Sequence, residues 1–167
     1  MKAERYLVGA CVLLAVASVS MVDPVAARAA PNETQGTVTK VVSCTANAGM
    51  GYSLEAKVEF SYTITGKHIA VGPTRYALSD RAGNKSNVDT EAGVWPVDYR
   101  DGKTEIYLGR LYSPDAMIGD GQWHALSQPH ERDLPFEPKL LHFAALVTFD
   151  ISGGADPSCW ADTDIRL

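Results

Sequence analysis

Residues Ser53 to Thr65 read SLEAKVEFSYTIT, a stretch in which polar and apolar side chains alternate without a break. The apolar positions fall at every second residue: Leu54, Ala56, Val58, Phe60, Tyr62 and Ile64. Successive side chains of a β-strand point to opposite faces of the sheet. A period of two over this length therefore predicts one long strand with one face buried and the other in water.

A turn and a second strand are predicted directly after this stretch. Thr65-Gly66-Lys67 has the composition of a tight turn, and residues 68–78 are again rich in apolar and β-branched side chains. Pro73 interrupts that second segment and cannot donate a ladder hydrogen bond. We therefore expect this strand to lie at a sheet edge or to contain a bulge.

Further strands and turns continue to the end of the chain. Asp101-Gly102 predicts a hairpin between residues 97–99 and 104–111, and residues 140–151 form a long apolar strand. Segments rich in Gly, Pro, Asn and Asp predict loops at 82–86, 113–121 and 127–139. No segment has the periodicity of a helix. About seven to nine short strands predict one all-β domain over residues 30–167, an antiparallel β-sandwich that is immunoglobulin-like or jelly-roll-like.

The first 29 residues have the pattern of a cleaved secretory signal peptide. Lys2 and Arg5 precede an uncharged, mainly apolar run over residues 6–22, and Ala27-Arg28-Ala29 is a small-x-small cleavage site. A retained signal anchor is one alternative. A lipoprotein acylated at Cys11 is another, although only five residues separate Arg5 from that cysteine. The Ala- and Val-rich signal suggests a bacterial host, and we predict a secreted, extracellular protein without a membrane segment after cleavage.

The two cysteines of the mature chain, Cys44 and Cys159, are predicted to form a disulfide. An exported protein with two cysteines generally pairs them, although free thiols or pairing between chains are alternatives. Cys44 lies on the apolar side of the first strand and Cys159 on the apolar side of the last. A bridge buried between the first and last strands fits both positions.

The charge of the mature chain argues against one class of partner. Cleavage after Ala29 leaves 12 basic and 18 acidic side chains, a net charge of about −6 with histidine neutral. The sequence contains no run of lysines or arginines. Binding to a phosphate backbone requires a basic face, so nucleic acid is excluded as the expected partner.

The segment Gly119-Asp120-Gly121-Gln122-Trp123-His124 contains the first candidate binding residues. It resembles the Asp-Gly-x-Trp-His turn and strand of laminin-G and other concanavalin-like jelly rolls, many of which bind sugars or calcium. In that family the Trp and His are largely structural. The resemblance implies a turn with a buried Trp123 and, as the alternative, a ligand site at Asp120, Trp123 and His124.

Two groups of residues have the chemistry of metal ligands. His124, together with His130-Glu131 and Asp133, could hold zinc, although the spacing fits no standard zinc pattern. Asp162 and Asp164 lie two residues apart on one strand face and could hold calcium, or form a solvated acidic face. We predict no cofactor.

The sequence contains no Gly-x-Ser-x-Gly nucleophile elbow, and no mature cysteine stays free once the bridge forms. The leading hypothesis is a secreted, non-catalytic, monomeric module that binds an extracellular protein or glycan through loops 81–87, 117–124 and 128–138. Trp95 and Tyr99 are its candidate exposed aromatic residues, with a place in the core as the alternative for either one. The alternative is a small hydrolase, or a metal-dependent sugar-binding protein, with a site near His124 and His130.

Overall fold

The computed structural model describes residues 35–49 and 51–167 of the chain. The predicted signal peptide, its cleavage site and Cys11 lie outside the described residues. The described part contains nine β-strands and no helix; their bounds are β1 (Gln35–Asn47), β2 (Ser53–Thr65), β3 (His68–Leu78), β4 (Asn87–Trp95), β5 (Ile106–Leu111), β6 (His124–Ala125), β7 (His130–Asp133), β8 (Leu140–Thr148) and β9 (Ser158–Arg166). It accordingly has no helix long and apolar enough to cross a membrane.

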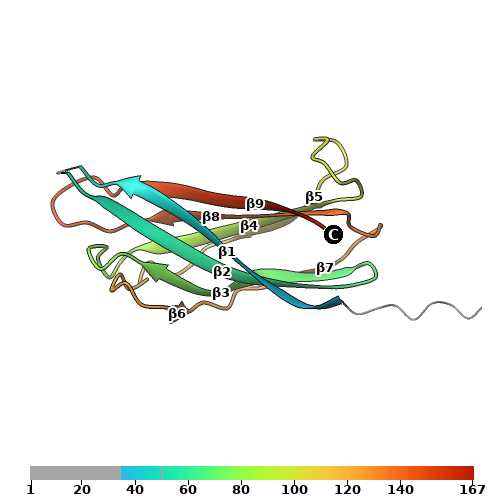
Figure 1. The fold of residues 1–167 in the computed structure, drawn as a ribbon, viewed down its shortest axis with the longest axis horizontal. Helices are drawn as coiled ribbons and strands as arrows, with labels where there is room; N and C mark the ends of the chain where they lie inside the picture. The colour runs from blue at the N-terminus through green and yellow to red at the C-terminus, as the bar shows by residue number, and fades with distance from the viewer. Residues whose placement is uncertain (1–34, 50) are drawn as a thin grey trace, which may run out of the picture. The chain divides into compact units, whose positions relative to one another are not determined.

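The strands form two antiparallel sheets, which confirms the predicted all-β class (Figure 1). The first sheet has the order β1-β2-β3-β6, and the short strand β7 also pairs with β3. The second sheet has the order β5-β4-β8-β9. Strands β1 and β9, which begin and end the described chain, are therefore each the last strand of a different sheet.

Strand β2 has the bounds that the alternating pattern predicts; its apolar positions from Leu54 to Tyr62 are buried, and Ile64 is half-buried. β3 also begins and ends where predicted. Its pairing with β2 shifts next to Pro73, because Glu59 pairs with Arg75 whereas Phe60 pairs with Pro73. The predicted bulge is thus present. It separates the part of β3 that pairs with β7 from the part that pairs with β6.

Several predicted boundaries are wrong, including the start of the strand predicted over 104–111, since β5 begins at Ile106. Residues 97–99 are not a strand but part of a ten-residue connection, 96–105, between β4 and β5. The predicted loop 127–139 contains β7, and the last long apolar strand ends at Thr148. The 96–105 connection turns at Asp101, whose carboxylate accepts hydrogen bonds from the backbone amides of Lys103 and Thr104. Hydrogen bonds from Thr104 lower the pKa of Asp101 to about 2.

Side chains from both sheets meet in one hydrophobic cluster. At its centre Phe60 of β2 stacks on Phe143 of β8, with ring centroids 4.0 Å apart and both side chains fully buried. The inward positions of β4 and β8, such as Val94 and Leu141, are also fully buried. Packing across the two sheets therefore accounts for the main apolar burial of the chain.

The predicted disulfide is confirmed. Cys44 of β1 and Cys159 of β9 are bonded; their Cα atoms are 5.8 Å apart and the residues are separated by 115 positions in the sequence. Both cysteines are half-buried and pack against the hydrophobic cluster. The bridge joins an edge of one sheet to an edge of the other, close to where β1 and β9 lie side by side.

Candidate functional site

A cleft lies beside the 96–105 connection, which projects at the upper right of Figure 1 near the end of β9. The cleft has a volume of about 750 Å³. Its lining combines three residues of the connection with residues of β8 and β9: Asp98, Tyr99, Arg100, Leu140, Asp164 and Arg166. None of the three loops that the sequence favoured for binding contributes to it.

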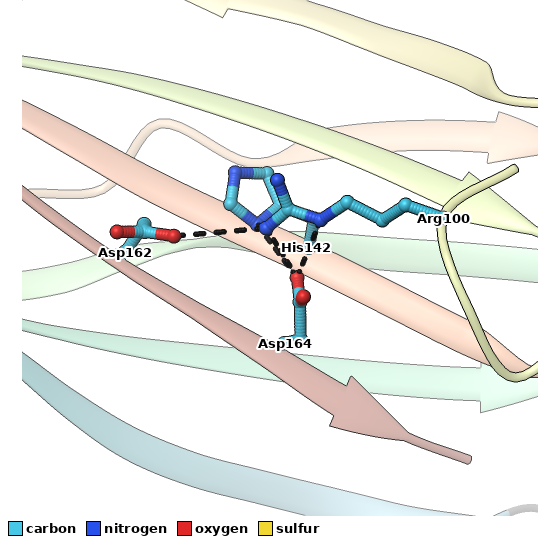
Figure 2. Close-up of polar contacts among 4 residues, drawn as sticks. All are labelled: Arg100, His142, Asp162 and Asp164. Atoms are coloured by element: carbon cyan, nitrogen blue, oxygen red, sulfur yellow. Dashed lines mark hydrogen bonds and ion pairs between the residues drawn. The ribbon is translucent and has the colours of Figure 1, made fainter. Parts of the chain in front are cut away.

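Arg100 is the central side chain of this site. Figure 2 shows it reaching from the connection toward His142 of β8 and the two aspartates of β9. Its Nε donates to Asp164 Oδ1 at 3.0 Å, and its Nη2 contacts the same oxygen and His142 Nδ1. Asp162 lies 3.6 Å from Nη2. One guanidinium thus bridges the loop to two strands.

His142 occupies the outer face of β8, as the alternation with Leu141 and Phe143 predicts, but it is buried there. Its Nδ1 lies 2.9 Å from Asp164 Oδ1 and is also in contact with Arg100 Nη2. A ring nitrogen donates only when it carries a proton and accepts only when it does not. Nδ1 donates to Asp164 when it is protonated and accepts from Arg100 when it is not, so only one of these two hydrogen bonds forms at a time.

Asp164 is held in its ionised form. Burial alone raises the pKa of its carboxyl group, but hydrogen bonds from Arg100 and His142 outweigh burial and hold the pKa below its ordinary value. An ionised carboxylate accepts hydrogen bonds and has no proton to donate. Asp164 is therefore suited to positioning Arg100 or a ligand hydroxyl, and poorly suited to general-acid catalysis.

The two candidate aromatic residues of this region have different positions. Tyr99 is 61% exposed at the cleft, as expected of a binding residue. For Trp95 the alternative applies, because only 2% of its surface is accessible and it is buried instead of exposed. The guanidinium of Arg100 lies 5.8 Å from its ring centroid.

Asp162 and Asp164 share the outer face of β9, as predicted, but both face a guanidinium. Arg100 supplies the positive charge that a cation would bring to these carboxylates. Within residues 35–49 and 51–167, no group of three or more His, Cys, Asp or Glu side chains is arranged to hold a metal. The calcium site stays a prediction without a ligand set in the described part of the chain.

The Asp120–His124 turn is a second, separate cluster. Asp120 Oδ1 lies 2.8 Å from His124 Nε2, and the His124 ring stacks on Tyr76. Trp123 was expected to be buried, but it is 40% exposed. The Arg75 guanidinium lies 4.7 Å from its ring centroid. The turn therefore presents a surface tryptophan under a cation instead of filling the core.

His124 and His130 do not belong to one site. His124 pairs with Tyr76 of β3 and His130 pairs with Val71. These positions are five residues apart, which is about 16 Å along a strand. His130 is buried, and no hydrogen-bond partner for its Nε2 occurs among the described residues. The structure thus gives no support to a zinc or hydrolase site shared by the two histidines.

His130 is expected to make the protein less stable in acid. Burial lowers its pKa below the ordinary 6.5, despite a hydrogen bond to the backbone of Leu108. The unfolded chain therefore takes up a proton first as the pH falls below about 6.5, and native stability decreases until the folded-state pKa is passed. Urea midpoints at about pH 8 and pH 5 should differ less in His130→Asn than in the wild type.

His68→Asn is the control for this change, because His68 is half-exposed and is paired with Asp133. His68→Asn leaves His130 in place. The contribution of His130 to the difference between its urea midpoints at about pH 8 and pH 5 should therefore be the same as in the wild type. Equal pH dependence in the wild type and His130→Asn would show that the buried imidazole does not govern acid stability.

Comparison of the chain with protein-family models, with curated proteins and with solved structures gives no match. The candidate site therefore depends on its geometry alone. Sequence reasoning found Tyr99, Asp162 and Asp164 but missed Asp98, Arg100 and Arg166. Arg100 lies 42 and 64 positions from its two main partners. No local pattern signals a contact over that separation.

Proposed function

We propose that this chain is a secreted, non-catalytic binding module that recognises a glycan in the cleft between the 96–105 connection and β9. The scaffold would be an antiparallel β-sandwich of immunoglobulin-like or jelly-roll-like type, released as a monomer after removal of residues 1–29. The disulfide supports export, because such bonds persist in oxidising compartments. The two sheets with a common hydrophobic cluster support a rigid scaffold for the loop.

The exposed ring of Tyr99 at a charge-balanced cleft is the observation that carries this proposal. The lining has two carboxylates, Asp98 and Asp164, and two guanidinium groups, Arg100 and Arg166. Their formal charges cancel, so a strongly charged ligand gains little there. Neutral sugars offer many hydroxyl groups, which can donate to carboxylates and accept from guanidinium groups, and an apolar ring face that can pack on tyrosine.

The chemistry of the cleft favours binding over catalysis. Its lining includes no serine, threonine or cysteine. Asp164 is kept ionised by Arg100 and His142, so it has no proton for a leaving group. The tyrosine, the guanidinium groups and the carboxylates can all contact a ligand without changing it chemically.

Tyr99→Ala is expected to weaken glycan binding about tenfold, which is the cost of losing one well-placed aromatic contact of about 1.4 kcal/mol. The secreted protein would be incubated with insoluble cellulose, chitin, xylan and peptidoglycan, and the retained fraction measured. Oligosaccharides of the retaining polymer would then be titrated calorimetrically. Arg166→Ala should also weaken binding, because it removes a hydrogen-bond donor of the cleft.

Tyr112→Ala is the matched control. Tyr112 is 68% exposed, as accessible as Tyr99, but it does not line the cleft. Its removal should leave retention unchanged. Retention by none of the four polymers, or equal losses for the two tyrosine variants, would contradict a glycan site at this cleft.

A further inference from the structure

Trp95 lies buried on a sheet face that is otherwise only partly covered. In β4 the inward positions are Val88, Thr90, Ala92 and Val94, which are fully or almost fully buried. The opposite positions are half-buried at the start of the strand, at Asn87, Asp89 and Glu91, but Gly93 and Trp95 are buried. The outer face of β4 is therefore covered only toward its end.

The cover comes from the 96–105 connection. The Arg100 guanidinium lies 5.8 Å from the Trp95 ring centroid. Gly93 lies next to both side chains, since a Cβ there would meet Glu105 Oε1 at 2.5 Å and touch Trp95 Cη2 at 3.4 Å, an ordinary van der Waals distance. Arg100, in the middle of the connection, therefore lies over the indole, and Glu105, its last residue, reaches the same stretch of β4 beside Gly93.

One side chain fastens this connection to the sheet. Among the described residues, every side-chain hydrogen bond and ion pair from residues 96–105 to the rest of the chain is made by Arg100. The remaining hydrogen bonds of the connection are internal, from Lys103 and Thr104 to Asp101. The connection is thus a locally folded unit with a single polar anchor.

Trp95 also carries an unused donor. Its Nε1 is inaccessible to solvent and has no hydrogen-bond partner among the described residues. A buried indole N–H normally finds an acceptor, because leaving one unpaired costs free energy. In the closed arrangement the Trp95 N–H, a group that can donate to a ligand, therefore has no partner in the described part of the chain. It lies under Arg100, which lines the cleft.

We propose that residues 96–105 are a strap, fastened by Arg100, that covers Trp95 and lifts to admit the ligand onto the indole. This inference rests on the proposed glycan-binding function and adds Trp95 to its site. With the strap open, the indole face would supply an aromatic surface on the sheet, facing Tyr99 on the strap, and its N–H would donate to a ligand oxygen. Asp164, released by Arg100, would accept from a ligand hydroxyl.

Opening of the strap can be measured without any ligand. Trp123→Phe and Trp160→Phe replace two exposed side chains and leave Trp95 as the only tryptophan of the mature chain. Acrylamide quenching of this protein then reports access to Trp95. Adding Arg100→Ala should raise the Stern–Volmer constant roughly threefold, because the anchored loop becomes free to open.

Arg81→Ala is the matched control, since Arg81 lies over another aromatic ring, that of Tyr52, at 5.0 Å. It should not change the quenching of Trp95. About 1 M sodium chloride, which reduces the screening length to about 3 Å, should act in the same direction as Arg100→Ala by weakening a half-exposed ion pair. Unchanged quenching in a folded Arg100→Ala variant would overturn the strap.

Hydrogen exchange of the unmutated protein covers the case in which Arg100→Ala fails to fold. The amides of residues 97–104 should exchange together and much faster than those of β4 and β8. Exchange at the rate of these strands would overturn the proposal.

Accessible Trp95 without retention by any polysaccharide would contradict only the proposed function, whereas retention with a permanently protected Trp95 would contradict only the strap.

Discussion

Replacing both Cys44 and Cys159 by serine is expected to lower the free energy of unfolding by about 5 kcal/mol, because the bridge closes a loop of 115 positions. A cross-link of that span removes much of the conformational entropy of the unfolded chain. For a domain of this size, the loss corresponds to a fall in melting temperature of about 15–20 °C. Thermal and urea unfolding followed by circular dichroism would measure both quantities.

Ser43→Ala is the control for this change, because it truncates an exposed neighbour of Cys44 in the same strand and keeps the bridge. It should shift the stability by less than about 0.5 kcal/mol. Treating the unmutated protein with a reductant should reproduce the loss seen in the double variant. A loss below about 1 kcal/mol in the double variant would mean that packing of β1 against β9 holds the two sheet edges without the cross-link.

The sequence predicts the central strands well because their burial depends on a local pattern. The alternation from Ser53 to Thr65 gives the bounds of β2 directly, and the apolar run ending at Leu78 gives those of β3. A sheet with one face buried requires this period of two at any position in the chain. Pro73 likewise marks the bulge, since the ladder must adapt to its missing N–H.

Segments that depend on tertiary contacts were predicted poorly. β7 has the sequence His130 to Asp133, in which only His130 is buried, and it forms because β3 offers a free edge there. Residues 97–99 have the composition of a strand, but the turn at Asp101 and the anchor at Arg100 hold them as a loop. Pairing partners far away in the sequence decide both cases.

The tryptophans show why exposure was harder to predict than strand position. Trp95 is the last residue of β4 and is covered by a loop that Arg100 anchors to β9, whereas Trp123 lies in a turn and has Arg75 beside it. A tryptophan has enough apolar surface to be buried and a polar N–H that tolerates exposure. Which of these prevails depends on tertiary contacts: the loop over Trp95 is anchored through Arg100 to Asp164, 64 positions away, and Trp123 lies far from Arg75 in the sequence.

Phe143→Ala is expected to lower the free energy of unfolding by about 3–5 kcal/mol, the usual cost of removing a fully buried phenylalanine. Phe143 lies in β8 and stacks on Phe60 of β2, so the cavity opens where the two sheets meet. Phe143→Leu keeps most of the volume and should cost less than about 1.5 kcal/mol. Urea unfolding of the three proteins would give this order.

A double-mutant cycle with Phe60→Ala tests whether the two sheets pack face to face, as a β-sandwich requires. The stacked rings should show a coupling energy of about 0.5–1.5 kcal/mol, because each ring is the other's main aromatic contact. Phe60→Ala combined with Trp160→Ala, on the exposed face of β9, should instead be additive within about 0.5 kcal/mol. Additivity of Phe60 and Phe143 would mean that the two rings do not interact, and it would argue against face-to-face packing of the two sheets.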